Sequence, residues 1–177
     1  MTDVVTTETT STVTVATPSS ATVNVEGTTS AIIRVDAEVT PEVPFAVNSG
    51  TLGTQPTFSG APLFSGSYIR AGNLVHFQVQ IDFDNITSFG TGQYFIDLPF
   101  TAKHAYQFTA GCLHDVSTGR DYPIYGHVAA GSIRMELQSM DVSGQVVYQI
   151  DFTSTNPVAL STADNFHVSG SYIAEED

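Results

Sequence analysis

The sequence predicts an all-β protein: a jelly-roll-like antiparallel β-sandwich over residues 58–177, preceded by an extended or small β N-terminal arm over residues 1–57. Apolar and polar residues alternate with the two-residue period of strands that bury one face. Gly, Pro, Asn and Asp separate these runs, as is typical of turns between short strands. The motif SGSYI also occurs twice, at residues 65–69 and 169–173, which predicts that the strands that open and close the sandwich are neighbours.

The arm is rich in threonine and valine. Val13 and Val15 alternate with threonines, and Val23 and Val25 repeat the pattern after a turn signal. β-branched residues in strict alternation favour strands, which need a partner sheet. The apolar side chains of the arm are few and small, so we expect the arm to become ordered against another surface. The Pro- and Gly-containing residues 41–56 are expected to form a linker.

The strongest strand pattern of the sandwich lies at residues 73–83. Val75, Phe77 and Ile81 share one face with the other apolar residues of this run, and polar residues occupy the opposite face. Further strands are expected at residues 94–98, 133–137, 146–152 and 166–168, with a hairpin turn at residues 141–144. Many short strands separated by turns fit a jelly roll or a related sandwich.

The charge of the chain excludes several classes of partner. Eighteen acidic residues against five basic ones give a net charge of −13, and both the arm and the sandwich are acidic. Such a surface repels phosphate, so nucleic acids and anionic membranes are not expected partners. Cys112 is the only cysteine, which leaves no disulfide framework. No apolar run approaches the roughly 18 residues that span a bilayer, and no signal peptide is visible at the N-terminus.

Metal-binding and catalytic patterns are weak. Cys112, His114 and Asp115 are close in sequence, but zinc needs about four converging ligands and no second pair stands at a suitable spacing. Asp82 and Asp84 on one strand are expected to be solvated, because calcium needs more oxygen ligands than two carboxylates provide. The chain has no G-x-S-x-G elbow and no identifiable carboxylate pair. We therefore expect no enzyme activity, no metal and no cofactor.

The region from Lys103 to His127 is the most polar and aromatic part of the chain, and we expect it to form loops. Tyr, His and Arg on loops are typical of surfaces that contact a protein or a sugar. The candidates for a receptor or partner loop are His104, Tyr106, His114, Arg120, Tyr122, Tyr125 and His127. The alternative is that these residues cap the sandwich or contact a sister subunit.

Several motifs in residues 56–177 occur in an order that resembles a known module. They are GSYIxxGNLVxF from Gly66, FGTGQY from Phe89, LPF from Leu98, GHVxxGS from Gly126 and ADNFHVSGSY from Ala163. The ordered set is similar to the C-terminal β-sandwich module of virion structural and tail-fibre-like proteins of tailed phages, especially cyanophages. The resemblance implies a homotrimeric β-sandwich on the outer surface of a virion, synthesised in the host cytoplasm.

The resemblance leads to two functional hypotheses. The first is a trimeric capsid decoration, or cement, protein whose arm binds the major capsid protein through Val13, Val15, Val23 and Val25. The repeated SGSYI motif predicts a trimer contact at Tyr68 and Tyr172, because small residues allow close approach and tyrosine offers a large contact area. The alternative is a tail-fibre or receptor-binding tip that recognises a host surface glycan. Host, receptor, copy number and position on capsid, tail or neck stay open.

Overall fold

The computed structural model describes residues 40–141 and 148–176, which belong to one compact unit, Glu38–Asp177. The described residues form strands and no helix, which confirms the all-β prediction. The strands are β1 (Val43–Pro44), β2 (Ser49–Thr51), β3 (Thr57–Phe58), β4 (Leu63–Ala71), β5 (Leu74–Asp82), β6 (Ile86–Ser88), β7 (Tyr94–Asp97), β8 (Tyr106–Asp115), β9 (Arg120–Val128), β10 (Arg134–Asp141), β11 (Tyr148–Asp151) and β12 (Asn165–Ile173).

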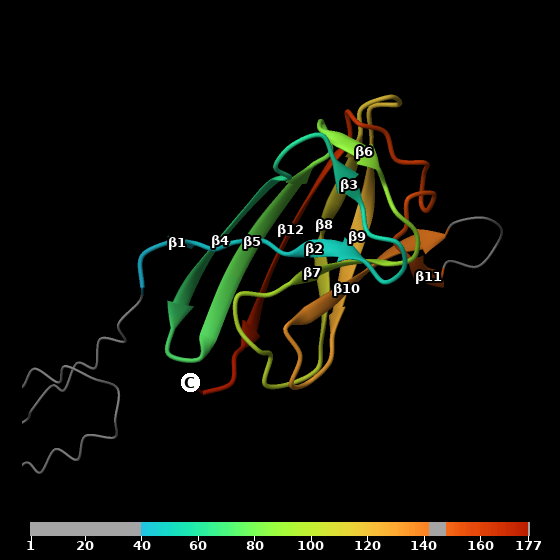
Figure 1. The fold of residues 1–177 in the computed structure, drawn as a ribbon. Helices are drawn as coiled ribbons and strands as arrows, with labels where there is room; N and C mark the ends of the chain where they lie inside the picture. The colour runs from blue at the N-terminus through green and yellow to red at the C-terminus, as the bar shows by residue number, and fades with distance from the viewer. Residues whose placement is uncertain (1–39, 142–147, 177) are drawn as a thin grey trace, which may run out of the picture. The chain divides into compact units, whose positions relative to one another are not determined.

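One continuous antiparallel sheet forms both layers of the sandwich. Its strand order is β1-β4-β5-β12-β8-β9-β10-β7-β2, with β11 paired to β10, and β3 and β6 form a separate two-stranded sheet. The sheet curls between β9 and β10, so that β2, β7 and β10 cross in front of β12, β8 and β9 (Figure 1). The jelly-roll-like sandwich predicted from the sequence is therefore confirmed as an antiparallel sheet that folds over onto itself.

A ring of four aromatic side chains closes the core between the two layers. Phe83 follows β5, Tyr94 begins β7, Phe152 follows β11 and Phe166 lies on β12; all four are at most 2% exposed. Neighbouring ring centroids in this cluster lie 5.5–6.2 Å apart in tilted or T-shaped pairs, which is the favoured arrangement of aromatic quadrupoles. Residues far apart in the sequence therefore hold the two layers together.

The two SGSYI segments lie on either side of one strand and are not neighbours of each other. β4 and β12 both pair with β5: Tyr68 lies opposite Phe77, and Tyr172 lies opposite Val75. The two copies are offset by two residues along β5, and an even offset keeps equivalent side chains on the same face of a sheet. Both tyrosines consequently face the core, and the prediction of direct neighbours is wrong.

The segment predicted to be a linker is part of the sheet. β1 pairs with β4, and β2 pairs with β7, so residues 41–56 cover an edge and extend the second layer. Phe45 and Val47 pack against the core above Gly66, where a Cβ atom would lie 2.6–2.9 Å from their side chains. Pro44 is compatible with β1 because β1 is an edge strand. The arm valines and the predicted turn at residues 142–144 lie outside the described residues.

Candidate functional site

The seven residues predicted to form a receptor or partner loop lie on or beside a long hairpin, β8–β9. The expectation of loops is therefore wrong for most of residues 103–127. His114, Tyr125 and His127 project from the outer face of this hairpin, away from the core. The His114 Nδ1 atom lies 2.8 Å from the Asp121 Oδ1 atom on the neighbouring strand, so this imidazole is oriented by a carboxylate.

The other four predicted loop residues do not join this group. Tyr106 and Tyr122 turn inward and pack against the core, and the Tyr106 hydroxyl accepts a hydrogen bond from the Ile173 amide at 3.0 Å. His104 precedes β8 and Arg120 begins β9, so these two exposed side chains lie at opposite ends of the hairpin. A β8 strand of ten residues separates them by about 30 Å at roughly 3.3 Å per residue. The seven residues therefore do not form a single binding loop.

The Cys112, His114 and Asp115 group is divided between the two faces of β8. Cys112 and His114 face outward, where the Cys112 sulfur lies 3.9 Å from both ring nitrogens of His167. Partial burial, and then the nearby Asp121 carboxylate, raise the pKa of the Cys112 thiol above its ordinary value. In residues 40–141 and 148–176, no three His, Cys, Asp or Glu side chains are arranged to hold a metal ion.

Asp115 has a structural role at the turn between β8 and β9. Its Oδ1 atom accepts hydrogen bonds from the Ser117 amide at 2.9 Å and hydroxyl at 2.6 Å, and its Oδ2 atom accepts one from the Thr118 hydroxyl at 2.7 Å. These hydrogen bonds, the Ser117 hydroxyl first, hold the pKa of the Asp115 carboxyl below its ordinary value. The carboxylate therefore fixes the turn and is not available to a ligand.

Replacing Asp115 with asparagine should destabilise the protein more at neutral pH than at low pH. The pKa of the Asp115 carboxyl is lower in the folded state than in the unfolded state. Such a carboxyl stabilises the fold fully above its unfolded pKa, about 3.9 for aspartate, and this stabilisation is lost as the pH falls through the pKa of the folded state. Urea denaturation at pH 7, 5 and 3 should show the difference between wild type and Asp115→Asn narrowing on acidification. Asp84→Asn, at an exposed position, is the control, and an unchanged difference at pH 3 would contradict the assignment.

Tyr172 cannot provide the predicted trimer contact, because it is 1% exposed. Its hydroxyl donates a hydrogen bond to the Phe100 carbonyl at 2.9 Å and accepts one from the Phe100 amide at 3.0 Å. Tyr68 is half-buried, with its ring 5.0 Å from the Phe100 ring and 6.3 Å from the Phe45 ring. Both tyrosines of the repeated motif thus support the fold of one chain, since their strands present these side chains to the core.

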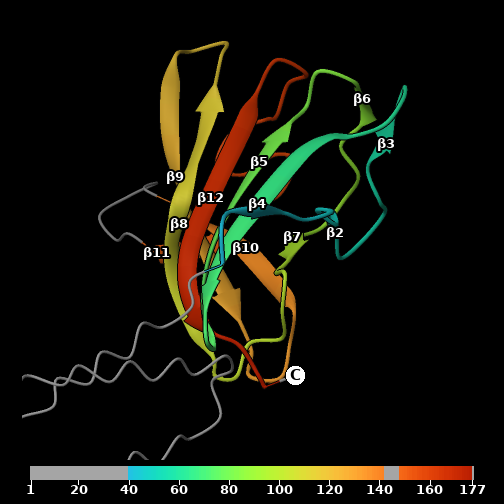
Figure 2. The same ribbon diagram turned by 90° about the vertical axis from the view of Figure 1, so that its left-hand side faces the viewer.

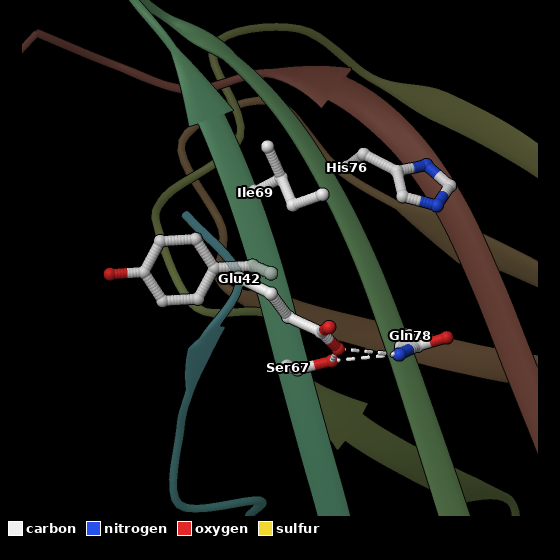
Figure 3. Close-up of a pocket in the computed structure, with 6 residues that line it drawn as sticks. Glu42, Ser67, Ile69, His76 and Gln78 are labelled. Carbon is white, nitrogen blue, oxygen red and sulfur yellow. Dashed lines mark hydrogen bonds between the residues drawn. The ribbon is translucent and has the colours of Figure 1, made fainter. Parts of the chain in front are cut away.

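A shallow hollow lies on the outer face of β4 and β5, near the point where β1 joins the sheet. Figure 3 shows Glu42 reaching over β4 toward Ser67 and Gln78. The Glu42 Oε1 atom accepts hydrogen bonds from the Ser67 hydroxyl at 2.6 Å and the Gln78 amide at 2.9 Å. Ile69 and His76 line the other side of this hollow, whose volume is about 150 Å³. The sequence pattern did not identify this site, because Glu42 lies in the segment predicted to be a linker.

A second hollow, of about 280 Å³, lies near the end of the chain. Its apolar lining comes from Pro99, Phe100 and Ile133, and Glu175 and Glu176 supply its carboxylates. Ile133 is 44% exposed there, and the Arg70 guanidinium lies 4.5 Å above the ring centroid of Phe100. The two carboxylates come from adjacent residues of one segment, and Thr101 adds a hydroxyl to the lining. This hollow is therefore an acidic, partly apolar surface feature.

Comparisons with known proteins identify one structural relative. No protein-family model matches the chain, and no curated protein matches it. The fold is similar to part of the crystal structure of the Dettilon tailspike protein, with a TM-score of 0.53 and 16% sequence identity. The match covers 76% of this chain and 24% of the tailspike chain, so this chain spans about a quarter of that protein's length. No helix in the described part of the chain is long and apolar enough to cross a membrane.

Proposed function

We propose that this chain is a structural protein of a tailed-phage virion, exposed on the outer surface of the particle, without enzyme activity. The observation that carries the proposal is the tailspike match: a sandwich of this fold, covering 76% of the chain, forms part of a tailspike protein. The ordered motifs from Gly66 to Tyr172 resemble the same general group of virion proteins. A fold likeness at 16% identity supports this assignment at the level of architecture, and the experiment below tests the function.

The chemistry of the described surface supports a mechanical role. Two of the polar side chains singled out in the sequence make structural contacts: His114 with Asp121, and Asp115 with Ser117 and Thr118. The net charge of −13 suits a protein that must not bind the packaged genome. An all-β sandwich with hydrogen-bonded turns provides a rigid domain that can project outward from the surface of the particle.

Within this class we propose a capsid decoration protein that acts as a homotrimer. The Thr- and Val-rich arm binds the major capsid protein by adding a strand to an exposed sheet edge, a mode in which backbone hydrogen bonds provide affinity. The sandwich then connects adjacent capsomers. The second candidate is a tail-fibre or receptor-binding tip, and the observation that favours it is that the structural relative is a tailspike.

The number of copies per virion should separate these candidates. Quantitative mass spectrometry of purified particles, normalised to the major capsid protein, is expected to give hundreds of copies, because a decoration protein occupies sites over the whole shell. A few tens of copies or fewer would identify a tail or neck component and contradict the decoration role. Absence from purified virions, with the protein present in the infected cell, would contradict the proposed function itself.

A further inference from the structure

One short segment of the chain joins the two ends of the curled sheet. β1 pairs with β4 at one end of the strand order, and β2 pairs with β7 at the other end. Only residues 45–48 separate β1 from β2, and in both ribbon views the segment runs from the side of β4 to β2 beside β7 (Figure 1 and Figure 2). We refer to residues 40–54, which hold both edges, as the clasp.

The first half of the clasp is bound to β4. The Thr40 amide donates a hydrogen bond to the Arg70 carbonyl at 2.9 Å, and the Phe45 amide donates one to the Gly66 carbonyl at 3.0 Å. Gly66 makes room for the clasp, because a Cβ atom at this position would lie 2.6 Å from the Val47 side chain and 2.7 Å from the Phe45 ring. These two side chains therefore rest directly on the backbone of β4.

The second half of the clasp is bound to β7 and to the loop that precedes β7. The Asp97 amide donates a hydrogen bond to the Asn48 carbonyl at 2.8 Å, and the Gly53 amide donates one to the Thr91 carbonyl at 3.0 Å. Thr51, between these two contacts, is 1% exposed. A single run of fifteen residues, 40–54, thus covers backbone edges that belong to opposite layers of the sandwich.

The core of the sandwich is complete without the clasp. None of the buried apolar side chains of the core comes from residues 40–54, all of which the structure describes; Phe45 and Val47 are only partly buried against it. The central strand β5, in contrast, is paired with a neighbour on each side along its whole length. Elements with few buried apolar contacts open at a lower free energy than the core does. The clasp can therefore open while both layers stay folded.

We propose that the clasp opens as one unit, below the free energy of global unfolding, and frees the backbone edges of β4 and β7 together. Val47 couples the two halves, since it rests on Gly66 of β4 and is followed directly by the residues that bind β7. The closed clasp is a poor acceptor for a further strand, because Pro41 and Pro44 have no amide hydrogen to donate. The open state presents the unpaired backbone groups to which extended segments add as strands. The clasp thus controls whether the two edges are available for strand addition, and this inference does not depend on the proposed function.

Hydrogen exchange of the full-length protein, resolved to single amides at increasing urea concentrations, tests the separate opening. Relative to their rates in an unfolded chain, the Leu52 and Gly53 amides, which are hydrogen-bonded to Gln93 and Thr91, should exchange at least about tenfold faster than the amides of β5. Their exchange should depend only weakly on urea, since a local opening exposes little surface. Identical protection and urea dependence in the clasp and in β5 would overturn the inference, because the clasp would then open only with the whole protein.

Gly66→Ala tests the coupling of the two halves, because its Cβ atom would displace Phe45 and Val47 without removing any residue of the clasp. The Phe45 and Leu52 amides, one from each half, should then exchange faster by the same factor, at least about tenfold, as overpacking destabilises the closed state. Val47→Ala, which removes the coupling side chain, should also raise both rates. Gly60→Ala is the matched control, since the nearest atom to its Cβ lies 3.9 Å away, and it should leave both rates unchanged. A rise confined to the Phe45 amide, or no rise in either half, would overturn the inference.

Discussion

Replacing Tyr172 with alanine should lower the free energy of unfolding by about 3–5 kcal/mol, the range for removing a large buried aromatic side chain. Tyr172 is 1% exposed and contacts the rings of Phe77 and Tyr106 at centroid distances of 6.0 and 6.3 Å. Burial raises the pKa of Tyr172 to about 12, as expected for a phenol held inside the fold. Urea denaturation followed by circular dichroism measures the change, and the alanine variant is expected to be partly unfolded at 37 °C.

Tyr172→Phe separates packing from hydrogen bonding at the same position. The phenylalanine ring keeps the aromatic contacts but leaves the Phe100 amide and carbonyl without their hydroxyl partner. The expected loss is about 1–3 kcal/mol, the penalty for an unsatisfied buried group. Tyr125→Ala, on the outer face of β9, is the control and should cost less than about 1 kcal/mol. Equal stability of Tyr172→Ala and Tyr125→Ala would contradict the buried position of Tyr172.

Replacing Gly111 with alanine should have the second large effect, a loss of about 3 kcal/mol or more from overpacking. Gly111 lies at the irregularity in the β8–β9 register, where β12 approaches β8 closely. A Cβ atom at this position would lie 1.8 Å from the carbonyl oxygen of His167 and 2.9 Å from the Cα atom of Val168. Both are backbone atoms, so relief requires the two central strands to move apart.

Gly60→Ala is the matched control for Gly111→Ala, because the nearest atom to a Cβ at Gly60 is the Asn85 amide nitrogen at 3.9 Å. The control should change the free energy of unfolding by less than about 0.5 kcal/mol in chemical denaturation. If Gly111→Ala proves as stable as Gly60→Ala, β8 and β12 cannot be as close as the structure has them. A stable but register-shifted variant would instead appear as altered amide exchange along β12.

The strand β5 shows how far sequence periodicity can predict this fold. The predicted strand at residues 73–83 matches β5, with Val75, Phe77 and Ile81 at most 1% exposed and His76 on the outer face. The prediction succeeds because β5 is a central strand with one face buried along its whole length, so local alternation reports burial directly. β12, which also alternates between buried and exposed residues, overlaps a predicted strand, and β7 falls within another although its first three residues are all buried.

The hairpin β8–β9 shows where periodicity fails. Phe108 and Ala110 are buried at even positions, whereas Leu113 and Asp115 are buried at odd positions. The register irregularity between Thr109 and Gly111 changes the phase of the alternation within one strand, as a β-bulge does when it inserts one extra residue. The alternation therefore has no constant period along β8, and the prediction of a partner loop rested on the polar and aromatic residues of this region.

The class of fold, the acidic and charge-poor composition, and the apolar face of β5 could all be predicted from the residues, because each depends on composition or on nearest neighbours along the chain. The positions that depend on pairing between distant strands became known only from the folded chain. The fold placed Tyr172 in the core and Leu74 and Ile69 on one exposed face, and it brought Glu42 across β4 to Gln78. The physical reason is that strand register links residues distant in sequence, and no local pattern records which strands will become partners.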